Sequence, residues 1–136
     1  MEFEAVIGIL AKAAGLKEGF VPQADGSVVV GAPDLFVTFK ELPAIGALMM
    51  RSELGDLPEK GSDRLAAMLL QENFMGRGAA GGTFSVGEGR KVFVHRLLPL
   101  ATADEEAILG EFGGFVNVAR EWKRIVGDYA AKVKAD

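Results

Sequence analysis

The sequence predicts an α+β fold in which an antiparallel sheet is covered by helices, with the element order α-β-β-β-α-β-β-α. Helical apolar patterns stand at both ends of the chain and once in its middle, and β-type runs follow one another in groups of three and two. Strands and helices do not alternate as a parallel doubly wound sheet requires. A length of 136 residues suits one domain, so we expect residues 1–136 to share one core.

The first element is expected to be an amphipathic helix over residues 2–15. Phe3, Ile7 and Leu10 recur at helical spacing, and Gly15 stands where a helix would stop.

Three strands are expected next. Residues 27–30 and 35–40 are rich in β-branched and aromatic side chains, and the turn-forming residues 32–34 separate them. A third strand fits residues 47–54, where the set Leu48, Met50, Ser52 and Leu54 alternates with Met49, Arg51 and Glu53.

A second helix is expected from an N-cap at Ser62 to Phe74, with Gly76 closing it. The stretch 76–82 contains so many glycines that we expect a mobile loop without regular structure.

A hairpin and a long helix complete the chain. The hairpin strands are expected at 83–86 and 91–98, with positive φ angles supplied by the glycines of the turn 87–89. Thr102 and Glu105 match a capping box. The apolar stripe of the helix that follows consists of Ile108, Phe112, Phe115, Ala119, Trp122, Val126 and Tyr129.

Composition excludes several classes of protein. The chain has no cysteine, which rules out disulfides and thiolate metal sites and suits a reducing compartment. Glu2 and Glu4 stand where a signal peptide needs basic residues, and no apolar run reaches the length of about 20 residues that a membrane span requires. A net charge of −4 gives no basic field for phosphates. We therefore expect a soluble cytoplasmic protein that neither enters membranes nor binds nucleic acid.

No motif in the sequence predicts catalysis. Residues 76–81 match G-x-G-x-x-G by letter, but the expected order is helix before and strand after, the reverse of a dinucleotide fold. Glycines 82 and 87 have P-loop spacing, but Glu88 stands where the phosphate-binding lysine belongs. His95 is the only histidine. We therefore expect no enzyme activity, no catalytic residue, no cofactor and no metal.

Apolar side chains are abundant enough to raise the question of an association surface. Methionine-rich surfaces adapt to varied partners, and an apolar patch left exposed by folding marks a site of association. The residues concerned either fill the core or form such a patch: Phe36, Phe39, Met49, Met50, Met68, Phe74 and Met75.

A series of short motifs follows one order along the chain. The motifs are Gly55-Asp56-Leu57-Pro58 upstream, then Leu69-Leu70-Gln71-Glu72-Asn73-Phe74, Val92-Phe93-Val94-His95-Arg96-Leu97, Leu98-Pro99-Leu100, Phe115-Val116 and Glu121-Trp122. By the order of these motifs, together with the length and the acidic character, the segment from Leu65 to Val126 resembles the Tir chaperone (CesT) family, the class I chaperones of type III secretion.

The resemblance implies a homodimer that holds the N-terminal segment of an effector protein in extended form and delivers it to the secretion ATPase. It places the subunit contact in the second half of the chain, at Leu65, Met68, Leu69, Phe84, Val86, Val92 and Val94. The first half then remains for the effector, at Phe3, Val6, Ile7, Leu10, Phe36, Thr38, Met49 and Arg51.

The choice of sheet face within the effector site depends on alternation alone. A shift of one residue would exchange the strand residues for Leu35, Val37, Phe39, Leu48 and Met50. Two other functions stay open: a small α+β pocket protein that binds an apolar ligand between sheet and long helix, and a relative of the chaperones that works outside secretion.

Overall fold

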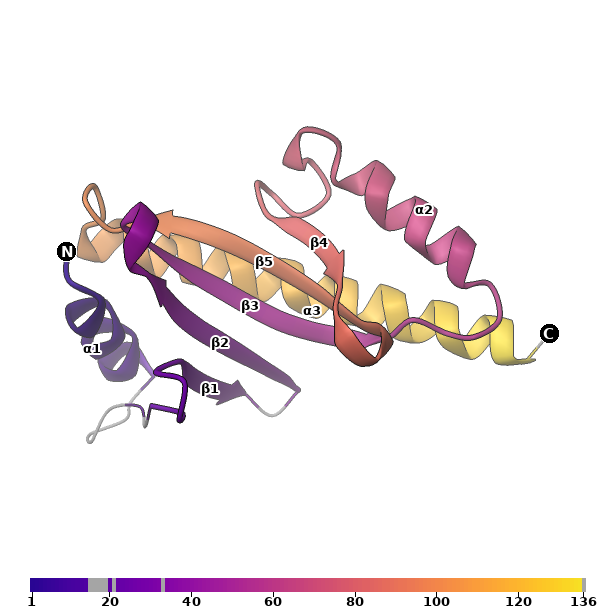
Figure 1. Ribbon diagram of the computed structural model, residues 1–136, viewed down its shortest axis with the longest axis horizontal. Coiled ribbons are helices and arrows are strands. Elements are labelled where there is room, and N and C mark those ends of the chain that lie inside the picture. The colour runs from indigo at the N-terminus through magenta and orange to yellow at the C-terminus, as the bar shows by residue number, and fades with distance from the viewer. Residues whose placement is uncertain (15–19, 21, 33, 136) are drawn as a thin grey trace.

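The computed structural model describes residues 1–14, 20, 22–32 and 34–135. The helices and strands occur in the predicted order (Figure 1). They are α1 (Phe3–Ala13), β1 (Val28–Ala32), β2 (Leu35–Leu42), β3 (Ala47–Asp56), α2 (Ser62–Glu72), β4 (Thr83–Val86), β5 (Lys91–Pro99) and α3 (Glu105–Ala135), with short 3₁₀ turns at Pro43–Ile45, Phe74–Gly76 and Glu88–Arg90.

The strands form one five-stranded antiparallel sheet in the order β1-β2-β3-β5-β4. In Figure 1, helix α3 runs behind the strands of the sheet, and its C-terminal part extends beyond their ends. Helix α1 lies beside the other end of α3. Helix α2 lies outside this layer, next to the short edge strand β4. The predicted α+β class and antiparallel sheet are thus confirmed.

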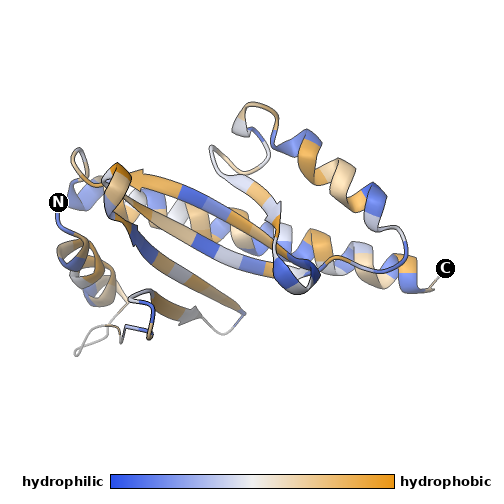
Figure 2. Cartoon of the chain, viewed as in Figure 1, coloured by the Kyte–Doolittle hydropathy of each residue, from blue (hydrophilic) through white to orange (hydrophobic). Residues whose placement is uncertain are grey.

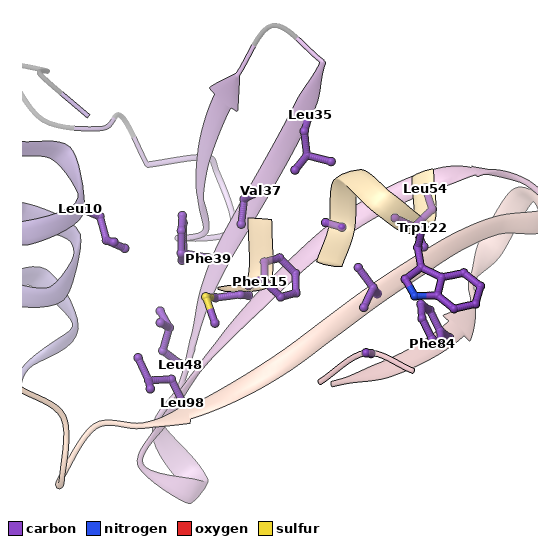
Figure 3. Close-up of a cluster of buried hydrophobic side chains, with 14 of the residues drawn as sticks. Leu10, Leu35, Val37, Phe39, Leu48, Leu54, Phe84, Leu98, Phe115 and Trp122 are labelled. Atoms are coloured by element: carbon purple, nitrogen blue, oxygen red, sulfur yellow. The ribbon is translucent and has the colours of Figure 1, made fainter. Parts of the chain in front are cut away.

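The core lies between the sheet and α3. Alternation along β3 buries Leu48, Met50 and Leu54 on the side that faces α3. The apolar stripe of α3, whose residues recur at steps of four and three as predicted, packs against them. Figure 3 labels Phe115 and Trp122 of this stripe. The buried members of the stripe are Ile108, Phe115, Ala119, Trp122 and Val126.

The connection from α2 to β4 is attached to the core by side-chain contacts. The Asn73 side chain accepts a hydrogen bond from the Phe84 N–H at 2.7 Å and donates one to the Phe84 carbonyl at 3.0 Å. The rings of Phe84 and Trp122 lie 4.7 Å apart, and both are labelled in Figure 3.

Residues 77–82 contain no helix or strand, as expected for the stretch 76–82, but the stretch also packs against the rest of the chain. The Gly81 N–H donates to the Gly76 carbonyl at 2.8 Å, and the Ala79 side chain is buried. At Gly82 a Cβ would lie 2.8 Å from the His95 carbonyl oxygen, so glycine is required by this close approach. Glycine here serves tight packing, which composition alone does not distinguish from flexibility.

Both predicted helix caps are wrong by one or two residues. Helix α2 follows Gly61, which has a left-handed φ of 76°, and Ser62 is its first helical residue without a side-chain cap. Helix α3 is capped by Asp104, whose Oδ1 accepts the Ala107 N–H at 2.8 Å, in place of Thr102. Aspartate caps helices as well as threonine does, so the sequence offers two neighbouring N-cap candidates, Thr102 and Asp104.

The remaining boundaries differ by small amounts. Helix α1 is regular to Ala13, and the predicted stop at Gly15 lies outside the described residues. Helix α2 ends at Glu72 and a 3₁₀ turn follows. In the hairpin turn Gly89 has positive φ as predicted, whereas Gly87 is extended and Arg90 takes the second positive value. None of the helices in the described ranges is long and apolar enough to cross a membrane.

Candidate functional site

The face of the sheet that points away from α3 carries no helix among the described elements (Figure 1). We call it the open face. Figure 2 shows hydrophobic and hydrophilic residues along the strands in this view. From β2, β3, β5 and β4 its residues are Phe36, Thr38, Lys40, Met49, Arg51, Glu53, Phe93, His95, Leu97, Thr83 and Ser85.

The predicted choice of sheet face agrees with the burial pattern. Phe36, Thr38, Met49 and Arg51 lie on the open face, whereas their strand neighbours on the other side are buried. Leu35, Val37, Phe39, Leu48 and Met50 form that buried set.

The open face presents large apolar side chains to solvent. The Phe36 side chain is 65% exposed, and its ring lies across Gly31, where a Cβ would come within 2.8 Å of the ring. Leu97 is also exposed, and Met49 is half-buried in the row between Lys40 and Leu97. Apolar groups left on a sheet face in this way are typical of a site of association.

A polar row crosses the middle of the same face. Strand register places Thr38 beside Arg51, Arg51 beside His95 and His95 beside Thr83. The Arg51 guanidinium carbon lies 5.4 Å from the centroid of the Phe93 ring, a cation–π contact. Partial burial, together with the nearby positive charge of Arg51, lowers the pKa of His95 below its ordinary value.

The four predicted effector-binding residues of α1 do not join this face. Phe3, Val6, Ile7 and Leu10 are all buried, and Val6 is 0% exposed. The amphipathic stripe of α1 packs into the core of its own chain, so these side chains are not presented to a partner as expected.

Phe3 and Ile7 nevertheless reach the wall of a surface hollow. The hollow has a volume of about 560 Å³ and is lined further by Phe20, Val28 and Lys40. At this hollow, side chains of α1 form part of the surface of the protein.

Most of the predicted subunit-contact residues are also buried within the chain. Leu65, Leu69, Phe84, Val92 and Val94 belong to the core, Met68 is partly buried, and Val86 is exposed. Five of the seven predicted residues therefore face the core of their own chain, and of the seven only Val86 is exposed. Two apolar sides on one helix made the choice ambiguous in the sequence.

The outward side of α2 and β4, together with the 3₁₀ turn Phe74–Gly76 that follows α2, is strongly apolar. Leu70 is 69% exposed, Phe74 64% and Met75 87%. With Val86 on β4 they form what we call the α2–β4 patch. A small hollow of about 150 Å³ between Leu70, Phe84 and Val86 interrupts it. The doublet Leu69-Leu70 was the signal in the sequence, because only one of two adjacent helical residues can face the core.

The patch adjoins a sheet edge. β4 is the last strand in the sheet order and pairs with β5 on one side only. On this edge the N–H and C=O of Phe84 are already hydrogen-bonded to the Asn73 side chain, so the α2–β4 connection covers the middle of β4.

The described residues contain no cluster of three or more metal-ligating side chains. In the same residues every buried side-chain nitrogen and oxygen has a hydrogen-bond partner.

The chain matches the sequence model of the Tir chaperone protein (CesT) family over residues 6–123. This match spans most of the chain, and the chain belongs to that family. A comparison with curated protein sequences finds no significant match.

Solved structures share the fold. The crystal structure of the ExsC-ExsE complex contains a chain with a TM-score of 0.74 and 16% identity, covering 93% of this chain and 97% of that one. A chain in the heterodimeric complex ExoU-SpcU from the type III secretion system of Pseudomonas aeruginosa has a TM-score of 0.68 and 15% identity, and the match covers 96% of this chain and 98% of that one. A chain in the structure of the Yersinia pestis type III secretion chaperone SycH, in complex with a stable fragment of YscM2, has a TM-score of 0.68 and 13% identity, and the match covers 89% of this chain and 99% of that one.

Proposed function

We propose that the chain is a cytoplasmic type III secretion chaperone that binds the N-terminal segment of an effector in extended form and keeps it soluble. Membership of the Tir chaperone family is the observation that carries the proposal. Similar folds occur in structures of chaperone–effector complexes, such as that of HopA1 with SchA, where the aligned chain has a TM-score of 0.69 and 14% identity. The open face supplies the apolar surface that such a function needs.

The effector segment lies on the open face in this proposal. Phe36, Met49 and Leu97 provide apolar contacts, and Thr38 and Arg51 provide polar ones. An extended segment whose side chains enter such a surface can vary in sequence, because shape and apolar area contribute most of the affinity.

The working form in this proposal is a homodimer joined by the α2–β4 patch. Its residues Leu70, Phe74, Met75 and Val86 are exposed apolar groups beside β4, the last strand of the sheet. A twofold axis through this patch would bring the same residues of two chains together, as an isologous contact requires. Covering them removes apolar surface from water, which favours association.

Three further points belong to the proposal. The chain acts as one domain, because a single sheet and a shared core connect its two halves. It carries out no catalysis and needs no cofactor. It passes its effector to the secretion ATPase.

Co-expression with the product of the neighbouring gene tests the proposal, since a chaperone is expected to be encoded beside its effector. We expect co-purification of the N-terminal segment of that product with the dimer. The substitution Met49→Asp on the open face should abolish capture while the protein remains folded. Leu109→Asp makes the same change at an exposed apolar residue of α3 and serves as the matched control. Equal capture by both variants would exclude the open face.

The alternatives predict other results. A pocket protein would be monomeric and would co-purify with a small apolar molecule. A chaperone relative that works outside secretion would bind a partner whose gene lies apart from any secretion apparatus.

A further inference from the structure

The centre of the open face is polar, although its surroundings are apolar. The row Thr38, Arg51, His95 and Thr83 crosses four neighbouring strands at one level of the sheet. All four side chains can donate a hydrogen bond, since the imidazole donates in its neutral form as well as when protonated. A row of donors is complementary to an acceptor, and best to a negatively charged one.

Arg51 has no carboxylate partner among the described residues. Other basic side chains of the sheet do: Lys91 pairs with Asp56 at 2.6 Å, and Arg96 pairs with Glu111 at 2.8 Å. In the described chain the Arg51 guanidinium stacks on the Phe93 ring, and its positive charge helps to lower the pKa of His95. A guanidinium that is stacked on a ring and lacks an anion is well placed to receive one.

The other charges of the face do not neutralise this centre. Lys40, on β2, lies next to Met49, but its positive charge acts on the Asp25 carboxylate, and both residues line the hollow near α1. Glu53 lies one pleat further along β3, within 3.9 Å of the Lys91 ammonium. Arg51 is therefore the positive charge of this centre, in a chain whose net charge is −4.

Apolar side chains stand on both sides of the polar row. Phe36 and Phe93 lie on one side, and Met49 and Leu97 lie on the other. A hollow of about 380 Å³ borders His95 and is lined by Met49, Thr83 and Leu97. Apolar groups of a bound segment would have contacts before and after the charged position.

We propose that Arg51 and His95 form a subsite for an acidic side chain of the bound segment, with the Thr38 and Thr83 hydroxyls beside them. The preferred segment then carries an aspartate or glutamate between apolar residues. This inference rests on the proposed function, because its occupant is the extended protein segment. The competing occupant is a backbone carbonyl of that segment, which Arg51 could bind without any preference for acidic residues.

A library of random linear peptides displayed on phage tests the inference. Selection against the wild-type protein should enrich peptides with Asp or Glu among apolar residues. Selection against Arg51→Glu should replace this acidic residue by Lys or Arg, and selection against Arg51→Lys should keep it acidic. Arg124→Glu makes the same charge reversal on α3, where Arg124 is exposed and paired with Glu121, and should leave the selected pattern unchanged.

A synthetic peptide from the wild-type selection gives the pairwise measurement. Replacing its acidic residue by the matching amide should raise Kd about three- to tenfold at low salt, and Arg51→Gln should have the same effect. Both changes together should cost no more than one of them, because they remove the same contact. The measurement with the amide peptide uses wild-type protein, so its result remains valid even if the Arg51→Gln variant folds poorly.

Three results would overturn the inference. They are a wild-type selection without acidic enrichment, a pattern that is unchanged with Arg51→Glu, and additive effects of the two changes in the cycle. Failure of the proposed function has a different signature, because wild-type protein would then not co-purify with the neighbouring gene's product. Capture of that product with equal affinity by wild type and Arg51→Gln would overturn the subsite and leave the chaperone function standing.

Discussion

The Trp122 indole N–H donates a hydrogen bond of 2.9 Å to the Gly78 carbonyl, connecting the middle of α3 to the glycine-rich stretch before β4. The two residues are 44 positions apart in the chain. Because Gly78, Ala79 and Gly82 lie between α2 and β4, this bond helps to fix the position of the α2–β4 patch relative to the core.

Trp122→Phe keeps an aromatic ring against Phe84 but removes the donor to Gly78. We expect a loss of about 1–3 kcal/mol in the free energy of unfolding, because the carbonyl loses its partner in a partly buried place. Chemical denaturation measures it. Amide exchange should rise more at Gly81 and Gly82 than in β3, and an even increase over the whole chain would contradict a local role for this bond.

The patch itself predicts the oligomeric state. Met75→Asp should convert the dimer into a monomer, because it places a charge in a contact that would otherwise be apolar. Met75 has a φ of 54°, a region that aspartate adopts more readily than methionine, so the fold should tolerate the change. Light scattering on a sizing column measures the mass. Leu109→Asp should remain dimeric, and a dimeric Met75→Asp would place the contact elsewhere.

Burial separates two of the residues that the sequence grouped in one effector site. Val6 is fully buried in the core, and Val6→Asp should unfold the protein, with a cost of more than about 4 kcal/mol. Met49 lies on the open face, and Met49→Asp should preserve the melting temperature within a few degrees. Circular dichroism measures both. A folded Val6→Asp variant that loses effector capture would return α1 to the binding site.

The sheet and α3 could be predicted because their patterns leave one choice. Along β3, the set Leu48, Met50 and Leu54 alternates with a set that contains the charged residues Arg51 and Glu53, and a strand has only two faces. The apolar stripe of α3 is similarly confined to one side. The residues that are buried can then be predicted from the spacing of apolar residues along the strand or the helix.

Helices α1 and α2 could be predicted as elements but not as surfaces. An apolar stripe requires a partner, yet it does not say whether that partner is the same chain, as for Val6, or another. In α2 the adjacent Leu69 and Leu70 point to different sides, and only the packing of α2 against Phe84 shows that Leu69 is the inner one. The exposed patch depends on tertiary contacts that local periodicity does not contain.

His95 provides the pH-dependent prediction, and it is the only histidine in the chain. Partial burial lowers its pKa, as does the positive charge of Arg51 on β3. The other groups around it are Thr83 on β4, which does not titrate, and Arg96 at the wall of the same hollow, which is paired with Glu111. With a folded pKa below the ordinary value of 6.5, the unfolded chain binds the proton more readily than the folded chain does.

Stability should therefore be fully present above about pH 6.5 and decrease as the pH falls through that value toward the lower pKa of the folded state. Carboxylates also titrate below this range, so the comparison is between wild type and His95→Gln, which lacks the imidazole but keeps a polar side chain. Thermal unfolding from pH 8 to pH 5 should show a smaller loss of stability for His95→Gln than for wild type. Parallel curves would mean that the pKa of His95 is the same in both states. A steeper loss in the variant would mean that the folded protein raises the pKa, which would require an anion beside His95 even in the unbound chain.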